Sequence, residues 1–338
     1  MAYYFNLPVV NDLTVDQQAA LDETESIALA GGPGTGKSVV CLWRHIRNYA
    51  TNTQKSLLLT YTKTLEHYLK QSAGSQSIES SLNVNRTLLW TSHSNIQKTY
   101  DEIIIDEGQD VSIDLYRTIK KFSNNVSYGA DDAQSLYADG CTPEQLANLF
   151  PKNAEYTMYK NFRNSKEILE FTRSVFPNIL IPQESINKAK QTGLKPIMKI
   201  TGRDSDSELE SIMSIINDFQ GDTHNIGILV PSKKDVTKYF DLIKDQLSAP
   251  IQCTKFEAEM GVFQGLSGIH ITTFKSSKGT EFDTVIIPNF DRFDWFIANT
   301  TIITEKDYYV AFTRTKINLF LICRNNPHKG DIRTFEIE

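Results

Sequence analysis

Short apolar runs alternate with longer stretches of helical periodicity along the whole chain. The runs have the length of buried strands, and the stretches between them repeat apolar residues every three to four positions. Such alternation predicts an α/β fold, in which mainly parallel sheets carry helices on both faces. The expected strands are 26–30, 56–61, 102–106, 125–129, 197–201, 226–230, 268–273, 284–288 and 317–323. The expected helices include 37–49, 63–71, 143–150, 165–175, 206–219, 233–246 and 303–312.

The stretch 150–153 is the expected boundary between two domains. The helix 143–150 ends at Pro151, and a new strand pattern begins after it. A proline disfavours the helical conformation of the residue before it, so a helix commonly ends there. The 338 residues allow two domains of ordinary size. We therefore expect domains at 1–151 and 152–338.

Composition places the chain among globular proteins. Hydrophobic residues make up 40% and charged residues 22% of the sequence, which is enough apolar surface for a real core. No apolar run approaches the ~20 residues that cross a bilayer, and residues 1–13 lack the pattern of a signal peptide. The four cysteines are scattered, which favours reduced thiols over a metal site. We expect a cytoplasmic protein without membrane contact.

Charge gives no overall signature of nucleic-acid binding. The formal net charge is −6, and the excess of acidic residues lies in residues 1–151. A polyanion would therefore have to use local basic clusters, although most surface lysines are simply solvated. The two clusters are Lys188, Lys190, Lys195 and Lys199, and Lys233, Lys234 and Lys238.

Residues 31–38 match the phosphate-loop pattern G-x-x-x-x-G-K-S. An apolar run precedes them and a helical pattern follows, whereas a glycine-rich turn without a ligand would usually lack this context. Small residues let backbone N–H groups turn toward phosphates at a helix N-terminus. Lys37 would reach the outer phosphates, and Ser38 could ligate Mg²⁺. The expected nucleotide-binding residues are Gly31, Gly32, Pro33, Gly34, Thr35, Gly36, Lys37 and Ser38.

A second signature lies where a β-branched run, 103–105, ends in two acids, Asp106 and Glu107. Ligands of open α/β sheets bind beyond the carboxyl ends of strands, so these carboxylates should reach the site of Lys37. Asp106 would hold Mg²⁺, and Glu107 would orient and deprotonate the attacking water. Alone, such a pair could be a solvated strand end. After a phosphate loop, it indicates nucleoside-triphosphate hydrolysis.

The string Asp106-Glu107-Gly108-Gln109-Asp110 resembles the D-E-x-Q-D box of superfamily 1 helicases of the UvrD/Rep-like branch. Further segments resemble the other boxes of this family, in the same order. They are 13–17 (the adenine-reading Q motif), 59–63 (motif Ia), 130–137 (motif III, with Ala130 in place of glycine), 160–164 (motif IV), 273–283 (motif V) and 309–316 (motif VI).

The resemblance implies two tandem RecA-like domains, with ATP and Mg²⁺ bound in the cleft between them. It assigns Gln17 and Phe162 to the adenine, Gly279 and Glu281 to nucleotide binding with Glu281 on the sugar, and Gln134 to sensing of the γ-phosphate. Arg163 and Arg314 would act as arginine fingers, which typically raise the rate of phosphoryl transfer by ~10³–10⁵. The catalytic residues would be Lys37, Glu107, Gln134, Arg163 and Arg314.

The family branch also implies movement on single-stranded DNA, in the 3′ to 5′ direction. Nothing in the sequence reads a 2′-hydroxyl, so RNA stays open as the partner. Tyr61 and Tyr137 could stack on bases of the strand, or they could simply pack within the protein. The expected nucleic-acid contacts are Tyr61, Thr62, His93, Tyr137, Thr273 and Lys275.

Two departures from the family weaken the expectation of processive unwinding. The gaps between the motifs leave no room for the inserted 1B and 2B subdomains, and 71–85 reads as a loop. The tryptophan that usually follows motif III is also missing, because Asp139 falls near its position. One stacking platform, worth ~1–3 kcal/mol per base, is therefore lost.

These departures keep a second class of function open. The chain could be an ATP-driven regulatory switch that signals to a protein partner, for instance a nuclease in an anti-phage system. A nucleotide-binding module without hydrolysis is a weaker alternative, because the residues needed for phosphoryl transfer are all present. We therefore expect an ATP hydrolase of the helicase or translocase type with weak or partner-dependent unwinding.

Overall fold

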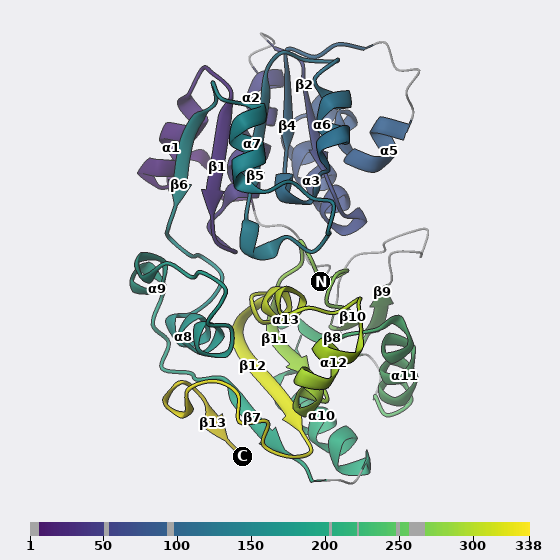
Figure 1. The fold of residues 1–338 in the computed structure, drawn as a ribbon. Coiled ribbons are helices and arrows are strands. Elements are labelled where there is room, and N and C mark those ends of the chain that lie inside the picture. Colours follow the sequence, from purple (N-terminus) through teal and green to yellow (C-terminus); the bar gives the residue numbers. More distant parts are fainter. Residues whose placement is uncertain are drawn as a thin grey trace. The chain divides into compact units, whose positions relative to one another are not determined.

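The computed structural model describes residues 7–50, 54–92, 98–202, 205–221, 223–247, 251–256 and 268–338. The chain divides between Lys160 and Asn161 into two compact units (Figure 1). Each unit has its own parallel sheet, and each is described by itself below.

The described strands of the first unit form one parallel sheet in the order β3-β2-β4-β5-β1-β6. Its strands β2 and β4 are buried along their whole length, as parallel strands covered on both faces should be. The strands are β1 (Ile27–Gly31), β2 (Ser56–Thr60), β3 (Val84–Arg86), β4 (Glu102–Ile105), β5 (Val126–Ala130) and β6 (Ala154–Met158).

Helices cover both faces of this sheet (Figure 1). Val40 and Leu69 belong to the core on one face, and Trp90, Tyr116 and Leu146 to the core on the other. The helices are α1 (Val15–Asp22), α2 (Lys37–Ala50), α3 (Lys63–Gln76), α4 (Ile78–Leu82), α5 (Thr87–Ser92), α6 (Ile113–Ile119) and α7 (Pro143–Leu149). Short 3-10 helices lie at Val10–Asp12, Gly108–Asp110 and Asp132–Gln134.

The second unit also has a parallel sheet, with its described strands in the order β13-β7-β12-β11-β8-β10-β9. The strands are β7 (Ile197–Ile200), β8 (Ile226–Val230), β9 (Cys253–Phe256), β10 (Ile269–Thr273), β11 (Phe282–Ile287), β12 (Thr315–Cys323) and β13 (Glu336–Ile337). The helices are α8 (Lys166–Val175), α9 (Gln183–Lys188), α10 (Ser205–Phe219), α11 (Lys233–Lys244), α12 (Phe293–Asn299) and α13 (Glu305–Phe312), with 3-10 helices at Phe290–Arg292 and Ile332–Thr334.

Two chemically different cores flank the second sheet. Aliphatic residues of α10 and α11, such as Ile216 and Ile243, pack with Ile228 and Ile271 of the strands. A separate group of aromatic rings joins α8, α12 and α13 through edge and stacked contacts. Its members are Phe171, Phe176, Phe290, Phe293, Tyr308, Tyr309 and Phe312.

The expected α/β fold with two parallel sheets is confirmed, and it is the tandem RecA-like architecture that the motif order implies. The expected boundary at 150–153 differs from the observed division, because β6 pairs with β1 in the first sheet. The expected loop at 71–85 was wrong. The end of α3, the whole of α4 and the start of β3 occupy it, and Ser81 Oγ donates to the Lys70 carbonyl at 2.9 Å.

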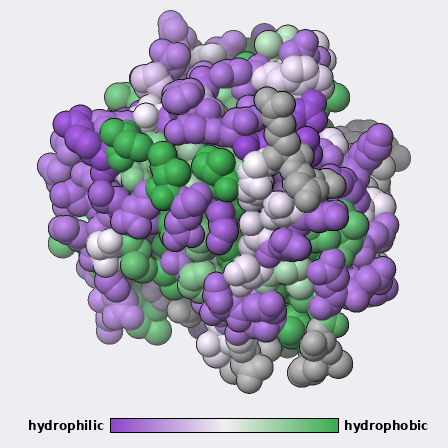
Figure 2. Space-filling model, turned by 90° about the horizontal axis from the view of Figure 1, so that it is seen from below, coloured by the Kyte–Doolittle hydropathy of each residue, from purple (hydrophilic) through white to green (hydrophobic). Residues whose placement is uncertain are grey.

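In the parts of the chain that the structure describes, no helix is both long enough and apolar enough to cross a bilayer. Figure 2 shows one face on which hydrophilic side chains surround a small group of hydrophobic ones. Singly exposed apolar residues are normal on such surfaces.

Candidate nucleotide-hydrolysis site

The phosphate loop connects the end of β1 to the start of α2 and depends on glycines at strained positions. Gly31 and Gly36 have φ angles of 149° and 88°, which residues with a Cβ rarely adopt. A Cβ on Gly31 would lie 2.5 Å from the Met158 carbonyl oxygen, and one on Gly36 would collide with the Gln17 amide. Both positions therefore favour glycine for conformation. Gly31 also requires it for space, and a Cβ on Gly36 would displace the Gln17 amide.

Lys37, the first residue of α2, folds back over the loop. Its Nζ donates to the carbonyl oxygens of Gly31 at 2.7 Å and Gly32 at 2.9 Å. The same ammonium lies 3.8 Å from Asp131 Oδ2, and the side chain is almost completely buried. Thr35 Oγ1 donates to the Gly32 carbonyl at 2.8 Å. These bonds place a desolvated positive charge inside the loop, where an anion would meet it.

Gln17 packs against the phosphate loop from the first helix. It forms a reciprocal capping box with Thr14, because Thr14 N donates to Gln17 Oε1 at 3.0 Å and Gln17 N donates to Thr14 Oγ1 at 3.3 Å. Its Nε2 donates to the Thr35 carbonyl at 3.1 Å. The side chain of Gln17 thus connects the start of α1 to the phosphate loop.

Asp106 lies directly after β4 and is buried. Burial first, and then the neighbouring charge of Glu107, raise its pKa to about 7, although Ser38 donates a hydrogen bond to it and Lys37 attracts its negative charge. Its Oδ2 is buried without a hydrogen-bond partner among the described residues. A buried oxygen of this kind is costly unless something binds it. The carboxylate and the Ser38 hydroxyl are hard oxygen ligands, so the pair fits Mg²⁺.

Glu107 is held in the left-handed backbone region, with φ 60° and ψ 44°. A non-glycine residue pays about 1 kcal/mol or more there, and such strain concentrates at functional sites. Its Oε2 accepts a hydrogen bond from Gln109 Nε2 at 2.6 Å. The sharp turn after β4 thus presents Glu107 directly beside Asp106 at the carboxyl end of the sheet.

Gln134 reaches the same site through Asp131. Gln134 Nε2 donates to Asp131 Oδ2 at 2.6 Å, and Asp131 is also the ion-pair partner of Lys37. The structure therefore brings together Lys37, Asp106, Glu107 and Gln134, although they come from three different strand ends. Asp131 and Gln109 were not predicted as site residues. Both lie inside recognised motifs. The role of Asp131 depends on β1 lying beside β5, that of Gln109 depends on β4 lying beside β5, and strand order was not predicted.

The described nucleic-acid candidates of the first unit are a pair of contacting aromatic rings and a helix-capping threonine. The rings of Tyr61 and Tyr137 contact each other, with centroids 4.5 Å apart and planes at 45°. Thr62 caps α3, because its Oγ1 accepts from Leu65 N at 3.2 Å. His93 lies outside the described residues.

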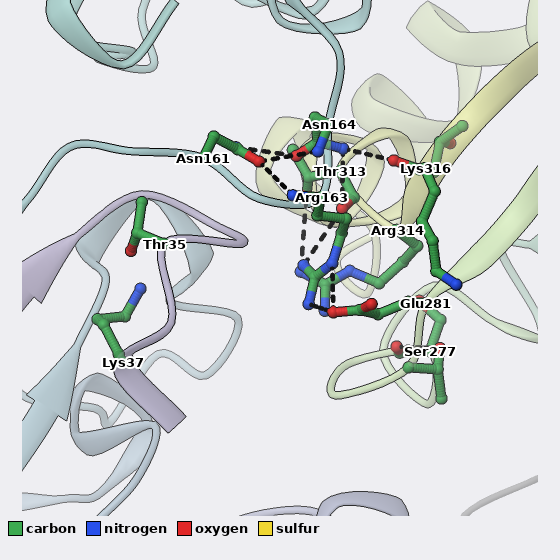
Figure 3. A network of polar contacts seen from close by, with 12 residues as sticks. Thr35, Lys37, Asn161, Arg163, Asn164, Ser277, Glu281, Thr313, Arg314 and Lys316 are labelled. Carbon is green, nitrogen blue, oxygen red and sulfur yellow. Dashed lines mark hydrogen bonds and ion pairs between the residues drawn. The ribbon is translucent and has the colours of Figure 1, made fainter. Parts of the chain in front are cut away.

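In the second unit, Arg163 forms a forked ion pair with Glu281 (Figure 3). Its Nε and Nη2 lie 2.8 and 2.5 Å from the same carboxylate oxygen, and Nη1 donates to the Thr313 carbonyl at 3.3 Å. Burial alone would raise the pKa of Glu281, but Arg163 and, more weakly, Lys316 and Arg314 outweigh it and lower the pKa. Glu281 is therefore a carboxylate surrounded by cations.

Two asparagines hold this arginine in place (Figure 3). Asn161 Oδ1 accepts from the backbone N–H groups of Arg163 and Asn164, each at 2.8 Å. Asn164 Nδ2 donates to the carbonyls of Thr313 at 3.2 Å and Thr315 at 2.7 Å. The segment 161–164 is thereby fixed to the turn between α13 and β12, about 150 residues further along the chain.

Arg314 lies in that turn and is almost completely buried. Its Nε donates to the Val310 carbonyl at 3.1 Å, and Figure 3 shows its side chain beside Arg163 and Glu281. Phe162 is 52% exposed, which suits a stacking surface better than a core position. Gly279 has a φ of 87°, so its turn also requires glycine.

The last two candidates for nucleic-acid contact lie at the carboxyl end of β10. Lys275 Nζ is 3.9 Å from Asp307 Oδ1, and Thr273 Oγ1 accepts from Ser276 N at 3.2 Å. Burial raises the pKa of Asp307, although its hydrogen bonds with Thr304 and the charge of Lys275 oppose this shift. Both candidates therefore have structural bonds within their own unit.

The class of the first unit follows from a family match as well as from geometry. Residues 16–138 match the model of the AAA domain family AAA_19. The match spans the phosphate loop, both acids after β4 and Gln134. The first unit is thus the ATP-hydrolysing domain of an enzyme. No curated protein matches the chain.

Several solved structures are similar in fold at low identity. The C-terminal domain of a possible DNA helicase from Lactobacillus plantarum WCFS1 is 16% identical, over 52% of this chain and 98% of that one, with a TM-score of 0.38. An arterivirus nonstructural protein 10 helicase, solved with DNA, is 13% identical over 92% and 63%, with a TM-score of 0.48. The PRRSV helicase is 12% identical over 94% and 56%, with a TM-score of 0.49. The chain thus spans less than two thirds of either viral protein.

Proposed function

We propose that the protein is a Mg²⁺-dependent ATPase motor of superfamily 1, of the UvrD/Rep-like type, that moves on single-stranded DNA. The observation that carries the proposal is the grouping of Lys37, Asp106, Glu107 and Gln134 at the carboxyl end of one parallel sheet. Phosphoryl transfer needs this combination of charge neutralisation and a positioned base.

Each residue of the first unit has a distinct role in the proposed reaction. The loop 31–36 and Lys37 bind the phosphates, and Gln17 supports the loop next to the adenine. Ser38 and Asp106 would hold Mg²⁺, which when bound neutralises charge on the phosphate oxygens. Glu107 orients the attacking water and accepts its proton. Gln134 senses the γ-phosphate or this water, and Asp131 holds the Gln134 amide.

The second unit supplies the arginines in this proposal. Arg163 and Arg314 lie around a single carboxylate, Glu281, so the group retains positive charge for the γ-phosphate. Phe162 stacks on the adenine, while Gly279 and Glu281 face the sugar. In this proposal, hydrolysis requires residues of both units.

Single-stranded DNA is the proposed track, with RNA as the alternative polymer. Tyr61 and Tyr137 would offer one paired stacking surface, because their rings already contact each other. Thr62, Thr273 and Lys275 would contact the backbone of the strand. The direction is 3′ to 5′, as the family branch implies. Unwinding is weak or depends on a partner, because the exposed Asp139 stands near the position where the family carries a stacking tryptophan.

A second candidate function is a regulatory switch that signals ATP binding to a protein such as a nuclease. The net charge of −6 favours it, since polyanion binding depends on neutralising phosphates. Two lysines of the basic clusters also have acidic partners. Lys188 Nζ lies 2.6 Å from Glu184 Oε1, and Lys199 Nζ lies 3.7 Å from Glu338 Oε2.

The deciding experiment is the steady-state ATPase rate at low salt, with and without single-stranded DNA. A motor is stimulated by the strand, whereas a partner-gated switch gives a flat response. Lys37→Ala should abolish turnover, and Lys121→Ala, which removes an exposed lysine, should not change it. Activity that survives both Lys37→Ala and Glu107→Gln would place hydrolysis elsewhere and overturn the proposed site.

A further inference from the structure

Gln109 connects two parts of the hydrolysis site, Glu107 after β4 and Asp131 after β5. Its side chain is 1% exposed and lies in the short 3-10 helix Gly108–Asp110, directly after Glu107. Nε2 donates to Glu107 Oε2 at 2.6 Å, and Oε1 accepts from Asp131 N at 3.0 Å. A carboxylate requires a donor and a backbone N–H requires an acceptor, so one orientation of the amide satisfies both.

The Glu107 end of this connection is the strained one. The left-handed backbone of Glu107 is a minor conformation that persists only where its surroundings enforce it. The bond from Gln109 is charge-assisted, and such bonds are shorter and stronger than neutral ones. Gln109 therefore fixes the direction of the carboxylate that is to accept a proton from water.

The Asp131 end leads to the other catalytic groups. Asp131 Oδ2 accepts from Gln134 Nε2 and lies within ion-pair distance of Lys37. Its Oδ1 accepts from Ala133 N at 3.1 Å, so both oxygens are engaged. A shift of the Asp131 backbone would move Gln134 and the partner of Lys37 together. Gln109 thus connects the position of Glu107 to that of Gln134.

We propose that Gln109 is a positioning residue for ATP hydrolysis, which holds the Glu107 carboxylate and the segment 131–134 in one fixed arrangement. The proposal rests on the proposed function of this same site. In this proposal Gln109 does not touch ATP itself and acts through the groups that do. Loss of Gln109 should lower kcat and leave nucleotide affinity almost unchanged, because binding depends on the loop and Lys37.

The test uses the full chain and the variant Gln109→Met, which keeps the buried volume and removes both hydrogen bonds. We expect kcat to fall by about 10- to 100-fold, since a displacement of about 1 Å in a catalytic group has effects of this size. Binding of a fluorescent ATP analogue should stay at the wild-type level. Gln71→Ala, which removes an exposed glutamine of α3, is the matched control and should hydrolyse ATP normally.

A double-mutant comparison distinguishes positioning from a general loss of structure. If Gln109 acts through the Glu107 carboxylate, adding Gln109→Met to Glu107→Gln should change single-turnover hydrolysis by less than about twofold. Gln109→Glu, which cannot donate and adds a like charge, should be at least as slow as Gln109→Met. Thermal unfolding of each variant establishes that it is folded.

The outcomes separate the two proposals. A wild-type protein without ATPase activity would overturn the proposed function. Active wild type with an unchanged Gln109→Met rate would overturn the role of Gln109 alone. Full additivity of Gln109→Met and Glu107→Gln, or a loss of nucleotide binding in folded Gln109→Met, would also contradict positioning through Glu107.

Discussion

Glu107 and Asp131 show how single residues acquire their role from position. The sharp turn after β4 forces Glu107 into a conformation that most residues avoid, and it places the carboxylate next to Asp106. The phosphate-loop and strand-end patterns were enough to predict Lys37, Asp106 and Glu107 as candidates, and the resemblance to superfamily 1 helicases added Gln134. These were not enough for Asp131, because that role arises only once β5 lies beside β1.

Gly36 provides a test at the residue scale. We expect Gly36→Ala to destabilise the first unit and to weaken ATP binding at least about tenfold, which corresponds to 1.4 kcal/mol. The added methyl would be strained at φ 88° and would collide with the amide of Gln17. Isothermal calorimetry and urea unfolding give the two readouts.

The matched control is Gly202→Ala, since Gly202 has a φ of 77° but open space around its Cβ position. It should cost only the backbone strain, about 1–2 kcal/mol, and leave ATP binding intact. Equal ATP affinity in Gly36→Ala and wild type would show that the collision with Gln17 has no functional effect.

Arg314 provides a second test. Arg314→Ala should bind ATP almost normally and hydrolyse it about 10³-fold more slowly, the lower range for loss of an arginine finger. Arg314→Lys should restore little, because lysine lacks the planar guanidinium. The exposed Arg333, paired with Asp331 in the same unit, supplies the control Arg333→Ala. A wild-type single-turnover rate for folded Arg314→Ala would remove Arg314 from the reaction.

At the scale of elements, the sequence predicted the long strands and helices well and the short ones poorly. The continuous apolar run of β4 and the amphipathic α2 stand out in any window of the sequence. β6 was missed because it is an edge strand of alternating exposure without a strong apolar run. The segment 71–85 was predicted as a loop from its serines, glutamines and single glycine, yet α4 packs against α3 and most of the segment is helical. Tertiary contacts here override local propensity.

A buried ion pair ties α2 to the sheet and gives a prediction about these elements. Arg44 Nε donates to Glu102 Oε1 at 2.7 Å, and Asn48 Nδ2 donates to Glu102 Oε2 at 3.0 Å. The other Arg44 nitrogens donate to the carbonyls of Glu23 and Glu25, both at 2.7 Å. Arg44→Ala should lower the free energy of unfolding by about 3–5 kcal/mol, because a buried carboxylate loses its partner.

Urea unfolding of Arg44→Ala is compared with that of Arg117→Ala. Arg117 pairs with Asp114 on the surface, where both side chains are mostly exposed. That variant should lose less than about 1 kcal/mol. Similar losses in the two variants would mean that burial does not strengthen the Arg44–Glu102 pair.

For the whole molecule, the alternation of apolar runs with helical stretches predicted parallel sheets, and the resemblance to superfamily 1 helicases implied two tandem units. Neither placed the boundary, because helix and proline signals at 150–153 are local while the pairing of β6 with β1 is not. The network of Arg163, Glu281 and Asn164 was likewise beyond prediction, as it joins segments more than a hundred residues apart.

Each unit contains a buried histidine that should make the protein sensitive to acid. Burial lowers the pKa of His45 to about 4 and that of His270 to about 3. The unfolded chain binds protons at these sites near pH 6.5, while the folded chain stays neutral. The stability that these two neutral histidines contribute is therefore fully present above pH 6.5 and is lost as the pH drops toward 4.

Urea midpoints at pH 7, 5.5 and 4.5 measure this loss. In His45→Asn the dependence on pH should be shallower than in the wild type, since one buried site no longer titrates. The same dependence on pH in His45→Asn and in the wild type would contradict the assignment of a neutral, buried His45.

The bond between Gln17 and Thr35 has a consequence for dynamics. Gln17 belongs at once to the N-terminal cap of α1 and to the phosphate loop. A nucleotide that orders the loop should therefore also hold the first turn of α1 closed. Amide hydrogen exchange in that turn should slow when ATP binds, and it should not slow in Gln17→Ala. The first helix would in this way report the occupancy of the phosphate loop.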